Sequence, residues 1–133
     1  MWPFTRRSSD GDETDLGKTG EELAAKFLRK QGLKILARNY RCPSGEADII
    51  ALDTKCPGGG EAVAFVEVKT RATDRYTSPE SAVNAAKQKH LRAVARYYCS
   101  SRDTTGLTIR FDIVAIVLAP PAEPKIKHIV AAF

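Results

Sequence analysis

Cysteine is scarce in this 133-residue sequence, and its three cysteines do not have the C-x-x-C spacing that is typical of zinc sites. Cys42, Cys56 and Cys99 are also odd in number, which argues against a framework of disulfides. We therefore expect free thiols and a reducing, cytoplasmic environment.

Long apolar runs are missing as well. No stretch approaches the ~20 apolar residues that a membrane-spanning helix needs, so we expect no membrane partner. The first fifteen residues contain arginines but no apolar segment behind them, which argues against a secretory signal. Residues 1–15 are polar and predict a disordered arm ahead of a single domain that spans residues 16–133.

Carboxylates are absent from one long stretch in the second half of the chain. No Asp or Glu occurs from Ser81 to Arg102, whereas five cations do: Lys87, Lys89, Arg92, Arg96 and Arg102. A solvated helix face would normally include glutamates that pair with such cations at i,i+4. A face of one sign is better explained by the phosphates of a nucleic acid, and the net charge of +5 points the same way more weakly. A basic face that binds an acidic protein remains an alternative.

Hydrophobic periodicity and turn residues divide the chain into two helices and five strands. Their order, α-β-β-β-α-β-β, predicts an α/β fold with a mixed central sheet flanked by helices. The first helix is expected to have Thr19 as its N-cap and Gly32 at its end, and the second to span residues 78–100. The strands are expected at 33–41, 46–52, 62–69, 107–118 and 126–133.

Two charged residues interrupt the strand "FVEVKTR" (65–71), whose lead-in is apolar on both faces. Glu67 and Lys69 are two residues apart, so both side chains leave the same face. The strand before it contains Asp48. Pairing these strands about the middle of the 53–61 turn places Asp48 opposite Val66, next to Glu67. One carboxylate per strand and one lysine would then converge at one end of an apolar sheet.

A cross-strand salt bridge to Lys69 is the simplest interpretation of these charges. On an exposed surface it would contribute about 0–1 kcal/mol, but in apolar surroundings the dehydration of each ion costs several kcal/mol. Asp48 and Glu67 also leave a surplus of negative charge beside one lysine. A hard divalent cation such as Mg²⁺, or Mn²⁺ in its place, would offset that surplus, so we favour a metal site.

Six blocks of the sequence together resemble the YraN family of small bacterial proteins, from about Gly17 to Val117. The blocks are "GKTGEELAAKFLRKQG", "ILARNYR", "GEADII", "FVEVKTR", "KQKHL" and "RFDIV". That family is similar to archaeal Holliday-junction resolvases, and "D-x(18)-E-V-K" on a hairpin resembles the PD-(D/E)xK nuclease superfamily. The resemblance implies a three-layer, restriction-endonuclease-like fold. Ala47 departs from the superfamily's Pro, and the 54–60 turn is unusually long, but no charged site residue is missing.

The resemblance implies a metal-dependent endonuclease that hydrolyses DNA, with Glu21, Asp48, Glu67 and Lys69 as the catalytic set. Asp48 and Glu67 would bind the metal, with the Val68 carbonyl as a candidate third ligand. Lys69 would orient or deprotonate the attacking water and help to neutralise the phosphate. Branched DNA is then a candidate substrate and a homodimer is reasonable. A nucleic-acid-binding module of the same fold that has no catalytic turnover is the alternative.

Two neighbouring glutamates compete for the acidic position on the first helix. Glu21 has Ala24 at i+3 and Leu28 at i+7, so it borders the buried stripe. Glu22 lies four residues before Lys26, which suits an ion pair in solvent. Glu21 is therefore the predicted site residue.

The expected second helix carries a buried stripe of Leu91, Val94, Ala95 and Tyr98. Towards its N-terminus the same stripe continues into Lys87 and Gln88. Either that end of the helix emerges into solvent, or both side chains reach the site and contact the scissile phosphate.

Further contacts with the DNA backbone are expected from cations on this helix and just past the charged strand: Lys89, Arg92 and Arg96, and Arg71 and Arg75. For Arg71 and Arg75, plain surface arginines are an equally good interpretation.

Four other polar residues have simpler interpretations. Arg110 and Asp112 are two apart on one strand and predict a structural pair. His90 and His128 have no metal-binding spacing to another His, Cys or acid, so we expect both at the surface or in an interface.

Overall fold

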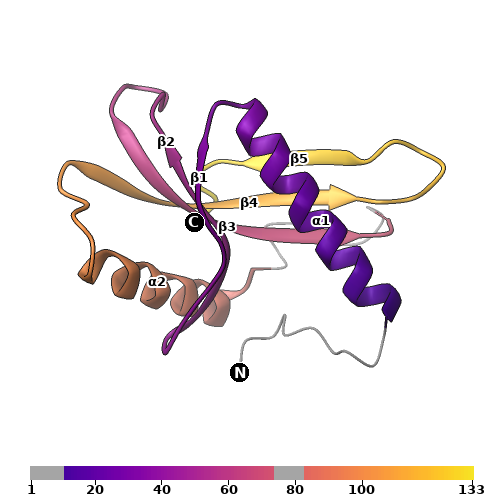
Figure 1. Ribbon diagram of the computed structural model, residues 1–133, viewed down its shortest axis with the longest axis horizontal. Helices are drawn as coiled ribbons and strands as arrows, with labels where there is room; N and C mark the ends of the chain where they lie inside the picture. Colours follow the sequence, from indigo (N-terminus) through magenta and orange to yellow (C-terminus); the bar gives the residue numbers. More distant parts are fainter. Residues whose placement is uncertain (1–10, 74–82) are drawn as a thin grey trace.

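The computed structural model describes residues 11–73 and 83–133, with side chains from residue 16 onward (Figure 1). Its elements are α1 (Gly11–Lys30), β1 (Lys34–Cys42), β2 (Gly45–Asp53), β3 (Glu61–Arg71), α2 (Ala85–Ser100), β4 (Leu107–Val117) and β5 (Lys125–Ile129). The predicted order of elements and the α/β class are confirmed. None of the described helices is long and apolar enough to cross a membrane.

The five strands form one mixed sheet in the order β1-β2-β3-β4-β5. β3 and β4 are parallel, and the other neighbours are antiparallel. Parallel neighbours need a crossover connection, and α2 lies in the connection between β3 and β4. The central strand of the sheet is therefore β3, the strand that carries Glu67 and Lys69.

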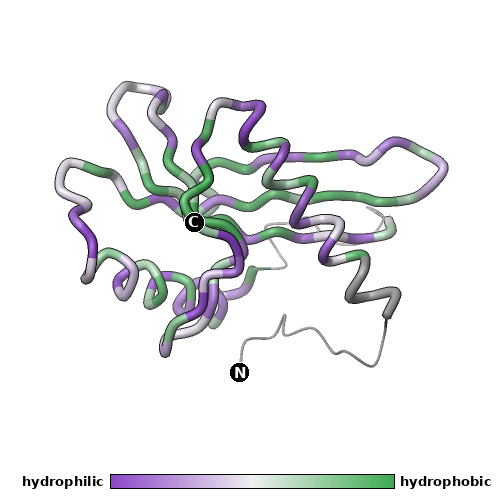
Figure 2. The backbone as a smooth tube through the Cα atoms, viewed as in Figure 1, coloured by the Kyte–Doolittle hydropathy of each residue, from purple (hydrophilic) through white to green (hydrophobic). Residues whose placement is uncertain are grey.

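The two helices cover opposite faces of the sheet. Along β3, Ala64 and Val66 pack with α1, whereas Val63 and Phe65 pack with α2. This alternation follows from the two-residue period of a strand and explains why the lead-in to Glu67 is apolar on both faces. Figure 2 shows hydrophobic residues along much of the central strands. Any charged group in β3 is thus placed between two hydrophobic layers.

The first helix starts earlier than the sequence predicts. It begins at Gly11, so Thr19 lies inside the helix and the prediction that Thr19 is the N-cap is wrong. Residues 11–15, which were expected to belong to the arm, are helical, and residues 1–10 lie outside the described residues.

The second helix is anchored by an N-cap. The Asn84 side-chain oxygen accepts a hydrogen bond from the Lys87 backbone N–H at 3.0 Å, and the helix begins at Ala85. The sequence predicts that this helix starts earlier, at residue 78, but residues 78–82 lie outside the described residues. The predicted buried stripe of Leu91, Val94, Ala95 and Tyr98 is confirmed.

The hairpin of β2 and β3 is shifted by one residue from the predicted register. Val66 pairs with Ile49, so the prediction that Val66 faces Asp48 is wrong. Asp53 pairs with Ala62, so the pairing is centred just after residue 57 rather than on it. The regular ladder ends at the Ile49–Val66 pair, and one further step brings Asp48 level with Glu67. Residues level with each other share a face of the sheet, so the shift favours an Asp48–Glu67 pair.

Candidate active site

Asp48 lies where β2 and β3 stop pairing. Its Oδ2 accepts a hydrogen bond from the backbone N–H of Val68 at 2.9 Å, just beyond the Ile49–Val66 pair. The carboxylate therefore takes the place of a backbone acceptor at the point where the two strands diverge. Its side chain is only 6% exposed, so the fold holds this acid in a fixed and largely dry position.

Glu67 is buried more deeply, at 1% exposure. Neither of its carboxylate oxygens accepts a hydrogen bond from the residues that the structure describes. Burial raises the pKa of Glu67 well above its usual range, and the charge of Asp48 raises it further. Lys69 and Lys87 act in the opposite direction but do not cancel these effects. A buried carboxylate with both oxygens unbonded is costly to the fold, which indicates a role other than stability.

The same surroundings shift the pKa of Lys69. Burial lowers its pKa to about 7, although the charge of Glu67 opposes this shift. Lys87 lowers the pKa further, through its charge and a side-chain hydrogen bond, and Arg71 contributes in the same direction. An amine with a pKa near neutrality can accept or donate a proton at physiological pH, as a general acid–base group must.

Lys87 brings α2 into the cluster. The sequence left two interpretations of this end of α2. Lys87 does not emerge into solvent, because it is 9% exposed and acts electrostatically on both Glu67 and Lys69. Contact of Lys87 and Gln88 with a scissile phosphate stays a prediction. Four ionisable groups from three elements are thus gathered at one end of the hairpin. We call Asp48, Glu67, Lys69 and Lys87 the charged cluster.

Lys87 also changes the charge balance that the sequence suggested. Two carboxylates now face two amines, so net charge alone does not require a cation. The stronger observation is that the Glu67 oxygens accept no hydrogen bond within the described part of the chain, although Lys69 and Lys87 are close enough to shift its pKa.

The two neighbouring glutamates of α1, Glu21 and Glu22, occupy different environments, as predicted. Glu21 is 4% exposed, whereas Glu22 faces solvent. The helix is pressed against the end of β3 at Gly20, where an added Cβ would overlap the Thr70 hydroxyl. Glu21 is therefore held beside the strand that carries Lys69.

Glu21 does not complete a set of three carboxylate ligands with Asp48 and Glu67. Across residues 16–73 and 83–133, no three His, Cys, Asp or Glu side chains are arranged to share one metal ion. The donors that remain are the oxygens of Asp48 and Glu67. These suit Mg²⁺ or Mn²⁺, because Mg²⁺ is commonly held by one or two carboxylates and keeps water or phosphate oxygens as its other ligands. The unbonded oxygens of Glu67 fit such an ion; the Val68 carbonyl as a third ligand stays a prediction.

The residues expected to contact DNA are placed unequally. Lys89, Arg92 and Arg96 are exposed on α2, and Arg71 is half-buried at the end of β3. The Gln88 side chain instead donates a hydrogen bond to the Val83 carbonyl at 3.1 Å, which ties it to the start of α2. Arg75 lies outside the described residues.

The segment that carries the charged cluster matches a known family. Residues 20–116 match the model of the uncharacterised protein family UPF0102, which covers most of the chain and every residue of the cluster. The chain belongs to the UPF0102 family.

Several UPF0102 relatives are similar over nearly their whole length. A UPF0102 protein of Nocardia farcinica is 42% identical over 123 residues, which are 92% of this chain and 92% of the relative. One of Solibacter usitatus is 44% identical over 119 residues, or 88% of this chain and 84% of the relative. One of Geobacter sulfurreducens is 40% identical over 118 residues, or 89% of this chain and 88% of the relative.

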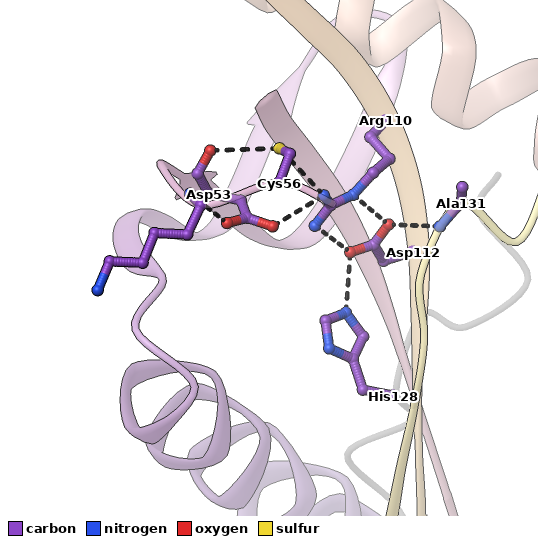
Figure 3. A network of polar contacts seen from close by, with 7 residues as sticks. Asp53, Cys56, Arg110, Asp112, His128 and Ala131 are labelled. Carbon is purple, nitrogen blue, oxygen red and sulfur yellow. Dashed lines mark hydrogen bonds and ion pairs between the residues drawn. The ribbon is translucent and has the colours of Figure 1, made fainter. Parts of the chain in front are cut away.

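This UPF0102 chain contains a second polar cluster, which we call the Arg110 network (Figure 3). Arg110 donates two hydrogen bonds to Asp112, at 2.9 and 3.0 Å, which confirms the predicted structural pair. The same guanidinium donates to Asp53 at the end of β2, at 2.9 Å, and lies 3.6 Å from the Cys56 sulfur. The three cysteines are free thiols, as expected.

His128 belongs to this network, so its expected place at the surface or in an interface is wrong. Its Nε2 lies 2.8 Å from Asp112, and its ring meets Phe27 of α1 edge-on. The backbone N–H of Ala131 also donates to Asp112, at 3.0 Å. The network thus joins β2, β4 and the end of the chain after β5. His90 is exposed, as predicted.

Proposed function

We propose that this protein is a metal-dependent nuclease that hydrolyses phosphodiester bonds of DNA. The observation that carries the proposal is Glu67, a fully buried carboxylate whose two oxygens accept no hydrogen bond from the described residues, beside Asp48, Lys69 and Lys87. The order of Asp48, Glu67 and Lys69 on a hairpin also supports it, because that order resembles the PD-(D/E)xK nucleases.

A purely structural role for the charged cluster is the weaker explanation. A buried ion pair stabilises a fold only when further hydrogen bonds satisfy its lone pairs, and those of Glu67 are not satisfied within the described part of the chain. The free-energy cost of burying these unsatisfied oxygens is large beside a total folding stability of about 5–15 kcal/mol. Perturbed, buried charges of this kind are typical of functional sites.

Each member of the cluster has a chemical role in this proposal. Asp48 and Glu67 would hold Mg²⁺ or Mn²⁺, which supplies charge neutralisation at the phosphate and an acidified water. Lys69, with its pKa of about 7, orients the attacking water and can take its proton. Lys87 donates to a phosphate oxygen of the scissile group. The exposed cations of α2 hold the flanking DNA backbone.

The likeness to Holliday-junction resolvases extends the proposal to branched DNA and to a homodimer, and the free cysteines support a reducing, cytoplasmic location. Two strands of a junction each need a cut, and two copies of one site would supply both. The alternative is a non-catalytic nucleic-acid-binding module of the same fold. Such a module would need the basic face of α2 but not the buried Glu67.

Metal binding is the first expected result. Calorimetric titration with Mn²⁺ should show binding to the wild type that Asp48→Asn and Glu67→Gln each weaken at least about tenfold, because each removes a charged oxygen ligand. Asparagine keeps an acceptor for the Val68 N–H, and Glu67→Gln removes a buried charge, so both variants should fold without metal.

Asp103→Asn is the matched control, because Asp103 is exposed and is hydrogen-bonded to Thr105, two residues further along the chain. Its Mn²⁺ affinity should equal that of the wild type. Equal affinity in the wild type and both site variants would remove Asp48 and Glu67 as the metal site.

A further inference from the structure

An open cavity of about 290 Å³ lies between α2 and the first half of β4. Its lining comprises four residues of α2 and two of β4: Arg92, Ala95, Arg96, Cys99, Ile109 and Phe111. None of them belongs to the charged cluster. The walls are mostly apolar, and the only charged side chains in the lining are the two arginines.

An aromatic surface forms one side of this cavity. Phe111 stacks on Phe133 with 5.3 Å between ring centroids and 14° between ring planes. The Arg92 guanidinium carbon lies 5.7 Å from the Phe111 centroid and 5.4 Å from that of Phe133. A flat ligand in the cavity would therefore meet both a planar cation and an aromatic ring.

The cavity opens beside a part of β4 that β5 does not cover. β5 pairs with β4 only over Ile113–Val117, so Ile109 lies ahead of the paired region. Ile109 is 37% exposed although it is a large aliphatic residue in the lining of a cavity. Apolar surface of this kind is available to a ligand from solvent.

Size and charge together select the occupant. Pockets for drug-sized ligands have volumes of about 300–1,000 Å³, so this cavity accepts one small flat group rather than a helix or a strand. Arg96 in the lining and Lys89 nearby on the exposed face of α2 favour negative charge on either side of that group. A flat, largely apolar ring flanked by anions is the chemistry of a nucleobase in a DNA strand. Bases that leave the stack bind to aromatic rings and to guanidinium planes in this way.

We infer that this cavity binds one unstacked nucleobase of the DNA substrate while α2 holds the adjacent phosphates. The inference rests on the proposed function and specifies its substrate class, DNA with an unpaired base near the cut. Arg92 and Arg96 follow Lys87 by five and nine residues, or about 7.5 and 13.5 Å along the helix. At about 3.4 Å per stacked nucleotide, the unpaired base lies roughly two to four nucleotides from the phosphate at Lys87.

The test measures binding without chemistry. In EDTA, wild-type protein is titrated into a linear duplex and into the same duplex with one extra, unpaired 2-aminopurine in one strand. We expect at least about fivefold tighter binding to the second DNA, from stacking of one base, together with a change in 2-aminopurine fluorescence. Ile109→Asp should abolish this preference and the fluorescence change, because it places a carboxylate in the cavity.

Thr108→Asp is the matched control. Thr108 is exposed and precedes Ile109 on β4, so its side chain leaves the opposite face while the net charge changes equally. This variant should keep the preference. Equal binding of both DNAs by the wild type, or equal effects of the two aspartates, would overturn the inference and leave the proposed function standing. A preserved preference in a protein that cuts nothing with Mg²⁺ or Mn²⁺ would support the inference and overturn the nuclease proposal. No binding to either DNA would overturn both.

Discussion

Lys69→Ala is expected to lower DNA cleavage at least about a hundredfold while leaving DNA affinity within about twofold of the wild type. The reason is that general acid–base groups typically contribute about 10²–10⁴-fold to rate, and Lys69 lies at the end of the hairpin rather than on the exposed face of α2. Cleavage and equilibrium binding should be measured on the same DNA, with Mg²⁺ for the first and EDTA for the second.

Lys89→Gln provides the opposite pattern. Lys89 is exposed on α2, so its loss should weaken binding and flatten the plot of log affinity against log salt by about 0.9 for one phosphate contact. The cleavage rate at saturating DNA should then be unchanged. If Lys69→Ala instead lowers affinity as strongly as it lowers cleavage, Lys69 binds the backbone and does not take part in the reaction.

Asp112→Asn is expected to destabilise the fold by about 3–5 kcal/mol, the cost of breaking a buried ion pair. Asp112 is fully buried and receives hydrogen bonds from Arg110 and the Ala131 N–H, with His128 also in contact. Its loss leaves the Arg110 guanidinium with Asp53 as its only described carboxylate partner. Urea unfolding of both proteins at pH 7 measures the difference.

The same variant should show a specific pH dependence. Burial alone would raise the pKa of Asp112, but hydrogen bonds from His128, Arg110 and Ala131 outweigh it and hold the pKa below the ordinary value of 3.8. A carboxyl group with a lowered pKa contributes stability above its unfolded pKa, and that contribution is lost as the pH falls through the folded pKa. The stability difference between wild type and Asp112→Asn should therefore be constant from about pH 7 to 5 and shrink below about pH 4.

Glu67 makes the stability of the fold change with pH in the opposite direction. The stability of the wild type must therefore be compared with that of the variant rather than followed on its own. Its raised pKa means that its contribution is present below the unfolded value of 4.5 and is lost as the pH rises. Subtracting the free energy of unfolding of Asp112→Asn from that of the wild type removes this effect, since both proteins contain Glu67. A difference that grows below pH 4 would contradict the lowered pKa of Asp112.

Local periodicity was enough to predict the elements and the phase of the helices. Ala24 and Leu28 fix the buried side of α1, and this places Glu21 inside and Glu22 outside, as the structure shows. The alternation of β3 similarly puts Glu67 and Lys69 on one face. These properties depend on residues close in the sequence, which is why the sequence alone could indicate them.

The pairing of distant residues could not be predicted in the same way. The predicted register of the hairpin was wrong by one residue, because the sequence of a long Gly- and Pro-rich turn does not determine which residue lies at its centre. Asp53 and Arg110 are 57 residues apart and sit on β2 and β4, on either side of β3. Their partners on β3 are Ala62 and Ala64, whose small side chains leave room for the ion pair. That arrangement depends on the parallel β3–β4 neighbours, which no local pattern reveals.

Cleavage by the wild type is the most direct test of the nuclease proposal. Four-way junction, flap and linear duplex DNA should each be incubated with the wild type in Mg²⁺, in Mn²⁺ and in EDTA, beside Asp48→Asn purified by the same steps. We predict cleavage of at least one of these DNAs with a divalent metal, none in EDTA, and none by Asp48→Asn. Failure of the wild type to cut any of them with either metal would contradict the proposal and favour a DNA-binding module, and cleavage that persists in Asp48→Asn would show that the activity arises elsewhere.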